Sequence, residues 1–365
     1  MKKGDIKYLA AYLLPICAMI GIVFPFHYSW LTPIVTFLLI PVIELFTPEN
    51  QANLHPTEVN QKSKSIFFDV LLYLNLPLVY GILIGSLLVL SKQELSPAQV
   101  IGLVFSVGII LGSNGINVAH ELGHRTGFWN QLLARLLLLP SHYTHFTLEH
   151  NYGHHAQVST PEDPATAQLN QSVYSFWWSS STGQYKNAWA IQKKLLVSQN
   201  QAFWSLKNDM LINTFLQVIY LSTLFVCFSW KVALWAMAMG IIGFLLLESI
   251  NYLEHYGLLR LQKKSGRYVP VKEIHSWNSN HLLGRILLYE LTRHSDHHYR
   301  ANKKYQLLDY HTESPELPYG YPTSILIALI PPLWFSIMNP RIPKEMRLMA
   351  EKHQDFKSRA ASLAK

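Results

Sequence analysis

The chain has 365 residues, of which 50% are hydrophobic and only 14% are charged. An average soluble domain carries about 25% charged residues, so this composition and a mean hydropathy of +0.13 exclude an ordinary soluble protein and a disordered chain. The 18 glycines and 2 cysteines exclude a collagen-like or disulfide-rich chain, and the net charge of +8 favours anionic lipid or an acidic partner over nucleic acid. The sequence therefore predicts a membrane protein, with 17 histidines as its most unusual feature.

Long apolar stretches alternate with polar segments, and about 20 apolar residues suffice for a helix to cross a bilayer. We expect an all-α integral membrane protein with about six transmembrane helices, at residues 8–26, 30–46, 66–90, 97–119, 211–228 and 231–250. The first stretch resembles a signal peptide, but its long apolar run has no clear cleavage site after it, so we expect a retained helix. The stretch 323–338 is too short and too rich in proline to count as a further span.

Lysine and arginine are distributed unevenly around these six segments. The three predicted outer turns and their margins contain only Lys92 and Lys231 of the 30 basic residues. Because positively charged loops stay in the cytoplasm, we expect an inner-membrane protein with both termini cytoplasmic. The polar regions at about 120–210 and 251–345 then lie in the cytoplasm, and the whole chain, 1–365, is expected to form one domain.

Eight histidines form three short boxes beside the predicted spans: His120 and His124 in His-Glu-Leu-Gly-His, His150, His154 and His155 in Glu-His-Asn-Tyr-Gly-His-His, and His294, His297 and His298 in Arg-His-Ser-Asp-His-His. On a helix, residues three or four apart share a face, so each box can direct two or three imidazoles at one point. A ninth candidate, His255, follows the sixth span. Eight clustered imidazoles exceed the needs of one tetrahedral site, so the boxes predict a cytoplasmic, histidine-rich cap that binds two ions.

Histidine spacing alone does not identify the metal, because imidazole binds zinc, copper, iron and nickel. The sequence from His120 to His124 is also the zinc-protease signature, in which Glu121 would act as general base. That alternative needs only one further ligand and leaves at least five boxed histidines without a role. A metal transporter would place polar residues at mid-membrane, whereas the predicted spans hold almost no charge apart from Glu44, Asp69 and Glu248.

Four stretches resemble motifs of the bacterial membrane-bound alkane 1-monooxygenases, at residues 120–124, 149–155, 251–258 and 293–298. The three histidine boxes alone are shared with membrane fatty-acid desaturases and xylene monooxygenase. The stretch Asn-Tyr-Leu-Glu-His-Tyr-Gly-Leu is a narrower mark of the alkane hydroxylases. Segments 160–165 and 275–281 match as well, and the resemblance extends from about residue 8 to about residue 343. Thr292 departs from the glutamine more usual in the family, which changes no ligand.

The resemblance implies a non-haem diiron monooxygenase that uses O2 to hydroxylate the terminal methyl group of alkanes, giving 1-alkanols. Its implied iron ligands are nine histidines: His120, His124, His150, His154, His155, His255, His294, His297 and His298. The implied electron donor is rubredoxin, reduced in turn by an NAD(P)H-dependent reductase. A related hydroxylase or desaturase acting on alkylaromatic or fatty acyl chains is the alternative within the same superfamily.

The chemistry of the substrate supports this interpretation independently. An unactivated methyl group offers nothing to an acid, a base or a nucleophile, so a metal cofactor and O2 must supply the oxidising power. An alkane dissolves in the bilayer, where a helical bundle can guide it toward metals at its cytoplasmic end. The chain has only Cys17 and Cys227 as thiols and no Gly-x-Gly-x-x-Gly loop, so electrons are expected from a separate carrier.

Residues near the boxes are expected to support the ligands or to receive the carrier. A metal-bound histidine usually donates its other N–H to a nearby acceptor, so we expect supporting contacts from a set beside the boxes: Glu121, Glu149, Glu254, Asp296 and His281. His142 and His145 are expected to line the entrance of the site. An acidic carrier would contact basic residues on the cytoplasmic face: Lys193, Lys194, Arg260, Lys263, Lys264, Arg267, Lys303 and Lys304.

Overall fold

The computed structural model describes residues 3–363, and the regular structure in that range is helical, with a few isolated β-bridges. Within these residues six helical segments are long and apolar enough to cross a membrane: Gly4–Val23, Pro25–Phe46, Ile66–Lys92, Pro97–Gly123, Asp209–Cys227 and Trp230–His255. The predicted all-α fold with six spans is therefore confirmed. The sixth helix continues about five residues beyond the predicted end and so includes His255.

The spans are built from one or more helices each. In chain order they contain α1 (Leu13–Val23); α2 (Pro25–Tyr28), α3 (Leu31–Ile34) and α4 (Ile40–Phe46); α6 (Ile66–Tyr73) and α7 (Asn75–Lys92); α8 (Pro97–Ile110) and α9 (Asn117–Gly123); α14 (Asp209–Cys227); and α15 (Trp230–His255). A π-helical turn, Leu111–Ile116 (η3), joins α8 to α9. The 26 residues of α15 rise about 39 Å, more than the roughly 30 Å of a hydrocarbon core. The end of α15 can therefore project beyond the membrane.

Short polar side chains mark where the long helices begin. Ser96 accepts from the backbone N–H of Gln99, whose side chain accepts in return from the Ser96 N–H, so the pair caps α8. Asn208 caps α14 and Ser229 caps α15 through the same kind of contact. Each cap satisfies a backbone donor that would otherwise lack a partner in the first turn.

Glycine allows the fourth and sixth spans to pack closely. A Cβ atom on Gly112 would lie only 3.2 Å from the backbone oxygen of Gly243 on α15. Gly108, one turn earlier on α8, faces Ile242 of α15 in the same way. Small residues permit such close approach of two membrane helices. This contact fixes α9 and the end of α15 relative to each other, which matters because both carry histidines.

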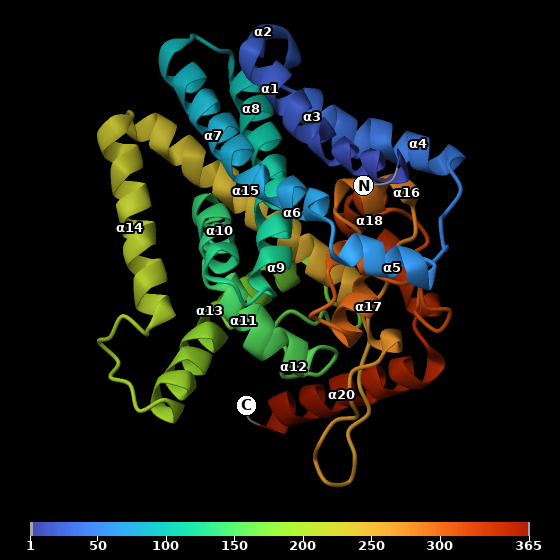
Figure 1. The fold of residues 1–365 in the computed structure, drawn as a ribbon. Coiled ribbons are helices and arrows are strands. Elements are labelled where there is room, and N and C mark those ends of the chain that lie inside the picture. Colours follow the sequence, from blue (N-terminus) through green and yellow to red (C-terminus); the bar gives the residue numbers. More distant parts are fainter. Residues whose placement is uncertain (1–2, 364–365) are drawn as a thin grey trace.

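The remaining helices lie outside the six spans, and most of them form a cap at one end of the bundle, whereas α10 packs along α9. They are α5 (Pro56–Ser63), α10 (Phe128–Leu138), α11 (Phe146–Glu149), α12 (His155–Gln157), α13 (Val173–Ser198), α16 (Leu282–Leu287), α17 (His294–Tyr299), α18 (Tyr321–Ala328), α19 (Pro331–Met338) and α20 (Lys344–Leu363). In Figure 1 the short connections at α2, between α7 and α8 and between α14 and α15 lie toward the top, whereas α11, α12 and α17 lie below the spans. The stretch 323–338 forms the short helices α18 and α19.

Candidate metal centre

Nine histidines gather in two groups at the cap end of the spanning helices. The five-histidine group consists of His120, His124, His150, His155 and His297, whose ligand atoms lie within 4.8 Å of one another. The four-histidine group meets the same criterion and consists of His154, His255, His294 and His298. The fold therefore brings together all nine histidines that the sequence singled out.

Ring nitrogens within each group are close enough to share one cation. The Nε2 atom of His150 lies 2.8 Å from Nε2 of His120 and 3.0 Å from Nε2 of His155. In the other group, 3.1 Å separates the Nε2 atoms of His255 and His294. Atoms bound about 2.1 Å from one ion lie roughly 3–3.5 Å apart. Two imidazole lone pairs at that separation repel unless a cation or a proton lies between them, so each group fits a metal ion.

Helices from distant parts of the chain carry these rings. His120 lies on α9 at the end of the fourth span, and His255 is the last residue of α15. The second box forms a π-helical turn, His150–His154 (η5), and the third box occupies α17. Such irregular turns within helices occur frequently at functional sites. The site therefore depends on the packing of two spans against two cap segments.

The second box supplies ligand candidates to both groups. His154 and His155 are neighbours in sequence, but successive side chains on a helix point in directions about 100° apart. The Nε2 atom of His154 lies 3.2 Å from that of His298 in the four-histidine group, whereas His155 faces His150 in the five-histidine group. One short turn thus holds the two groups side by side.

The environment keeps most of these imidazoles uncharged. Burial lowers the pKa of His150 and of His297 well below the ordinary value, and neighbouring histidines lower it further. Burial also lowers the pKa of His124 to about 4. A metal binds the neutral form of histidine, through a free ring lone pair. His154 is the exception: burial lowers its pKa, but the Asp163 carboxylate raises it by more. The histidines whose pKa is lowered are in the neutral form that binds a metal.

Asp163 contacts the Nδ1 side of the His154 ring, away from the other histidines of the group. Its Oδ2 atom lies 2.9 Å from Nδ1 of His154, and Thr166 donates to the same oxygen at 2.6 Å. Burial opposes the charge on the Asp163 carboxylate, but His154 outweighs it and lowers the pKa of Asp163. A carboxylate on the outer ring nitrogen fixes the tautomer and the orientation of a ligand histidine. The sequence prediction omitted Asp163, although it lies in the family-like stretch 160–165.

Glu254 is also in contact with a boxed histidine. Its Oε2 atom lies 3.1 Å from Nε2 of His294, and Tyr321 donates to its other oxygen at 2.6 Å. The side chains of Glu254 and Tyr321 are almost completely buried, at 1% relative exposure each. Tyr321 has no neighbour in sequence that would have identified it, since it lies on α18 beyond the last histidine box.

The other predicted supporting residues bond to segments around the site. Glu121 pairs with Arg125 at 3.0 Å, and Glu149 accepts from Asn187 at 2.8 Å. Asp296 accepts from Lys303 at 2.6 Å. The Glu121–Arg125 pair is local to the end of α9, whereas Glu149 ties α11 to α13 and Asp296 ties α17 to the segment that follows it.

Two further histidines lie close to the third box, and one of them, His281, was expected to support a ligand. His311 lies 2.8 Å from the second carboxylate oxygen of Asp296, so Asp296 holds the segment that follows α17. Nδ1 of His281 lies 3.1 Å from the hydroxyl of Ser279, two residues earlier. Both histidines thus contribute to local structure around the box.

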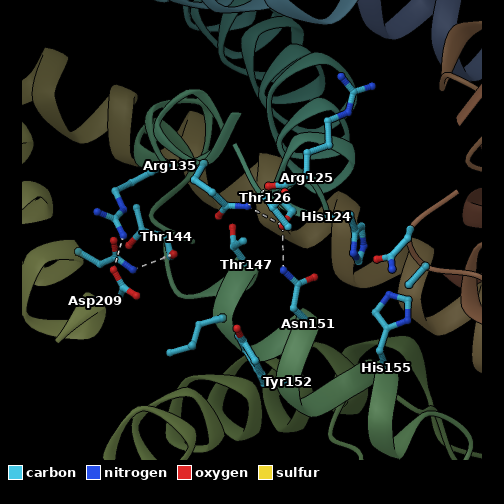
Figure 2. Close-up of a pocket in the computed structure, with 16 residues that line it drawn as sticks. His124, Arg125, Thr126, Arg135, Thr144, Thr147, Asn151, Tyr152, His155 and Asp209 are labelled. Carbon is cyan, nitrogen blue, oxygen red and sulfur yellow. Dashed lines mark hydrogen bonds and ion pairs between the residues drawn. The ribbon is translucent and has the colours of Figure 1, made fainter. Parts of the chain in front are cut away.

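A polar cavity of about 500 Å³ reaches the five-histidine group from outside. Figure 2 shows His124 and His155 at one side of it, with Arg135 and Asp209 at the opposite side. These two histidines are the half-buried members of a group whose other members are buried. His142 and His145 are not among its lining residues, so the expectation that they line the entrance is wrong. His142 instead faces Gln217 of α14, with 2.7 Å between the paired nitrogens.

A second, apolar cavity lies among the spans. Its lining includes Phe37, Ile109 and Leu246 from the second, fourth and sixth spans, together with Tyr321. The Tyr321 hydroxyl donates to Glu254, which contacts His294. The apolar cavity is thus connected to the four-histidine group through two side chains.

Some basic residues of the cap are paired or buried, and the others are exposed. Lys303 binds Asp296 and Asp309 at 2.6 Å each, and Lys304 lies 3.5 Å from Asp69. Arg260 donates to the Ala156 backbone oxygen at 2.7 Å and is largely buried. The side chains that are exposed are Lys193, Lys194, Lys263, Lys264 and Arg267. These five remain available to a partner.

Comparison with known proteins gives one matching family model, "Fatty acid desaturase", over residues 95–325. The chain is 35% identical over 334 residues to an alkane 1-monooxygenase of Acinetobacter baylyi, a match that covers 91% of this chain and 82% of the relative. An alkane 1-monooxygenase of Ectopseudomonas oleovorans is 35% identical over 345 residues, covering 93% of this chain and 86% of the relative. The xylene/toluene monooxygenase hydroxylase component of Pseudomonas putida is 30% identical over 342 residues, covering 90% and 87%.

Proposed function

Because this chain belongs to the alkane 1-monooxygenases of the fatty acid desaturase family, we propose that it hydroxylates the terminal methyl group of alkanes with O2, giving 1-alkanols. The family predicted from the histidine motifs is confirmed by similarity over about nine-tenths of the chain. The protein is accordingly an oxidoreductase and a multi-pass membrane protein with histidine clusters suited to metal binding. The observation that carries the proposal is the pair of histidine groups beside an apolar cavity.

The metals we propose are two iron ions, one in each histidine group, held by the nine histidines named above. The support is the convergence of ring nitrogens to separations of 2.8–3.3 Å within the groups. Bound iron would supply the oxidising power that an unactivated methyl group requires. Asp163 would orient the ring of His154, and the buried surroundings would favour the neutral form of histidines such as His150 and His297.

The proposed substrate route is the apolar cavity among the spans. An alkane in the bilayer makes no hydrogen bonds, so only shape and apolar contact can position it. Phe37, Ile109 and Leu246 offer such contact, and Tyr321 lies where the cavity approaches the four-histidine group. A chain held in this cavity would present its end to the metals, which favours attack on the terminal carbon.

The proposed electron donor is rubredoxin, reduced by an NAD(P)H-dependent reductase. Forming one alcohol and one water from O2 and an alkane requires two electrons, and the two cysteines here cannot form a four-cysteine iron site. Cys17 is buried and Cys227 is exposed, and they are not paired. The exposed basic residues of the cap and the polar cavity at His124 and His155 support a docking surface on this side of the molecule.

We further propose that the protein lies in the inner membrane with both termini and the cap in the cytoplasm, as one domain over 1–365. The support is the scarcity of basic residues at the opposite end of the bundle, where Lys92 and Lys231 lie. Reduced carriers and NAD(P)H are found in the cytoplasm, which suits a cap on that side.

An aromatic substrate is the second candidate, because a xylene/toluene monooxygenase component is among the relatives. Its identity of 30% is below the 35% shared with the alkane enzymes. The zinc-protease alternative has little support, because Glu121 is held by Arg125 and the family is one of oxygen-dependent enzymes.

Metal and product analysis of the purified protein test the proposal together. We expect two iron ions per chain, and 1-alkanols when reduced rubredoxin, O2 and alkanes of several lengths are supplied. Xylene should be turned over more slowly than an alkane of similar size. Zinc in place of iron, with no oxygen consumption, would contradict the proposal.

A further inference from the structure

We propose that the polar cavity beside the five-histidine group is a water-filled path that carries protons to the proposed metals. The inference rests on the proposed function, in which one alkane, one O2, two electrons and two protons give one alkanol and one water. One oxygen atom enters the terminal C–H bond, and the other takes up both protons and leaves as water. Rubredoxin would deliver electrons without protons, so the protons need a route of their own from solvent.

Two cavities approach the histidines, and the polar one suits this role. The cavity among the spans is lined by side chains such as Phe37, Ile109 and Leu246, which cannot hydrogen-bond to a row of water molecules. The polar cavity has a volume of about 500 Å³, room for roughly ten or more waters at about 30 Å³ each. Most of its lining residues carry hydroxyl, amide, imidazole or charged groups. Water is therefore stabilised in this cavity.

Polar side chains follow one another from the outer end of the cavity to the histidines. Asp209 at the outer end has a side chain that is 49% exposed. Asn213, one turn further along α14, is only 5% exposed. Thr147 and Asn151 line the cavity between this end and the two half-buried histidines, as Figure 2 shows. The row thus begins at solvent and ends at the five-histidine group.

Two amide oxygens in this row require a partner that the surrounding side chains do not provide. Asn213 donates to the Thr144 backbone oxygen at 3.0 Å, and Asn151 donates to the Gly123 backbone oxygen at 2.9 Å. The Oδ1 atom of each amide is buried, and neither has a hydrogen-bond partner among the described residues. Buried polar atoms are nearly always paired, and water supplies the bond where protein groups do not. Both oxygens therefore indicate bound water.

Hydrogen-bonded water is sufficient for the proposed transport. A chain of waters can transfer protons between solvent and a reacting group. The amides of Asn213 and Asn151 would hold that chain in place without gaining or losing a proton themselves. The same path would let the water product leave, so that neither protons nor water need to cross the apolar cavity that the alkane occupies.

Cysteine labelling tests whether water fills the cavity, and it needs no turnover. Asn213→Cys is made in the full-length protein with Cys227→Ser, which removes the exposed thiol, while Cys17 is buried. In lipid nanodiscs the chain is treated with a charged methanethiosulfonate, which reacts with thiolates in water. We expect near-complete labelling by mass spectrometry. Val218→Cys, exposed on the same span, is the control and should stay unmodified because lipid covers it.

Turnover tests whether this water carries protons. Asn213→Leu replaces the amide by an apolar group, so it should lower kcat about tenfold or more and enlarge the solvent deuterium isotope effect. Iron content and the KM for alkane should not change, since Asn213 belongs to neither histidine group. Asn213→Ser keeps a hydroxyl and leaves room for another water, so it should recover most of the rate. Thr214→Leu, exposed on the same helix, should match the wild type.

Either test can overturn the inference. An unmodified Asn213→Cys chain would show that the cavity is dry, and a wild-type rate and isotope effect in folded Asn213→Leu would show that protons take another route. Circular dichroism and size-exclusion profiles check folding. If Asn213→Leu does not fold, labelled Asn213→Cys decides, because the attached reagent obstructs the cavity and should slow turnover until a reductant removes it. A wild-type chain that forms no alkanol overturns the proposed function, whereas the labelling result does not depend on it.

Discussion

His255 lies outside the three histidine boxes, yet its ring belongs to the four-histidine group. Its Nε2 atom is 3.1 Å from that of His294, and the side chain is completely buried. We expect His255→Ala to lose iron from one site and to abolish hydroxylation, because that site would keep only three imidazoles. Iron content per chain, measured after purification from membranes, checks the prediction.

His353 provides a matched control for this substitution. It lies on α20 and belongs to neither histidine group. His353→Ala should therefore retain both irons and near-normal turnover. Normal iron content in His255→Ala would remove His255 from the ligand set.

Asp163 orients the imidazole ring of His154, and a substitution at Asp163 tests that role. Asp163→Asn preserves the shape of the side chain but removes the charge that holds Nδ1 of His154. We expect roughly 10- to 100-fold weaker iron binding, the usual effect of removing a contact behind a ligand. Competition with a chelator of known affinity measures it. Asp209→Asn, at a surface pair with Arg135, is the control and should leave iron binding unchanged.

The sequence predicted which histidines to examine but could not divide them into two groups. Spacing within a box indicates which rings share a face, and that was sufficient to identify the candidates. The division depends on contacts between distant segments, such as His154 with His298, 144 positions apart. The neighbours His154 and His155 enter different groups because successive side chains on a helical turn point in directions about 100° apart, and the packing of distant helices decides which group each one meets.

Among the helices, the spans were predictable and the cap was not. Twenty apolar residues in succession have few alternatives to a membrane helix, so all six spans were found to within a few residues. The cap consists of short helices, such as α12 with 3 residues and α17 with 6. Helices of that length are held by tertiary contacts and leave only a weak local signal.

Gly240 allows α15 to pack closely against the turn at Pro140, so a larger side chain there should destabilise the protein. A Cβ atom on Gly240 would collide with the backbone oxygen of Pro140 and the ring of His142. Because a backbone oxygen cannot move aside easily, Gly240→Ala should destabilise the protein by about 1–3 kcal/mol. Thermal unfolding in detergent should then begin at a lower temperature than in the wild type.

Gly81 on α7 is the matched control, since a Cβ atom there would meet nothing within 4 Å. Gly81→Ala should be neutral or slightly stabilising, because alanine favours a helix more than glycine does. Equal unfolding temperatures in the two variants would show that α15 can shift away from the turn at Pro140.

The exposed basic residues of the cap are the proposed docking surface for an acidic carrier. Exchanging Lys263 and Lys264 together for Glu should raise the apparent KM for rubredoxin several-fold and leave the KM for alkane unchanged. Rising salt should slow the wild-type enzyme, because exposed charges are screened over about 8 Å at physiological ionic strength. Steady-state rates at several carrier and salt concentrations check both effects.

The opposite end of the bundle supplies the control for this experiment. Lys92 and Lys231 precede or follow the outer connections, and exchanging both for Glu should not affect the carrier. If both double variants behave like the wild type and the rate does not depend on salt, docking does not use these charges. Full activity with NADH alone would eliminate the need for a separate carrier.

The unequal exposure of the two histidine groups has a consequence for how the protein would lose its metals. The polar cavity reaches His124 and His155, whereas the four-histidine group is buried on all four members. A small hydrophilic chelator can therefore approach one ion directly but must wait for local opening of the fold to reach the other. We expect iron release in two kinetic phases of equal amplitude, and only the slower phase should quicken under mild destabilisation. Protein stopped midway would hold a single iron, in the buried site, and could be refilled with a different metal.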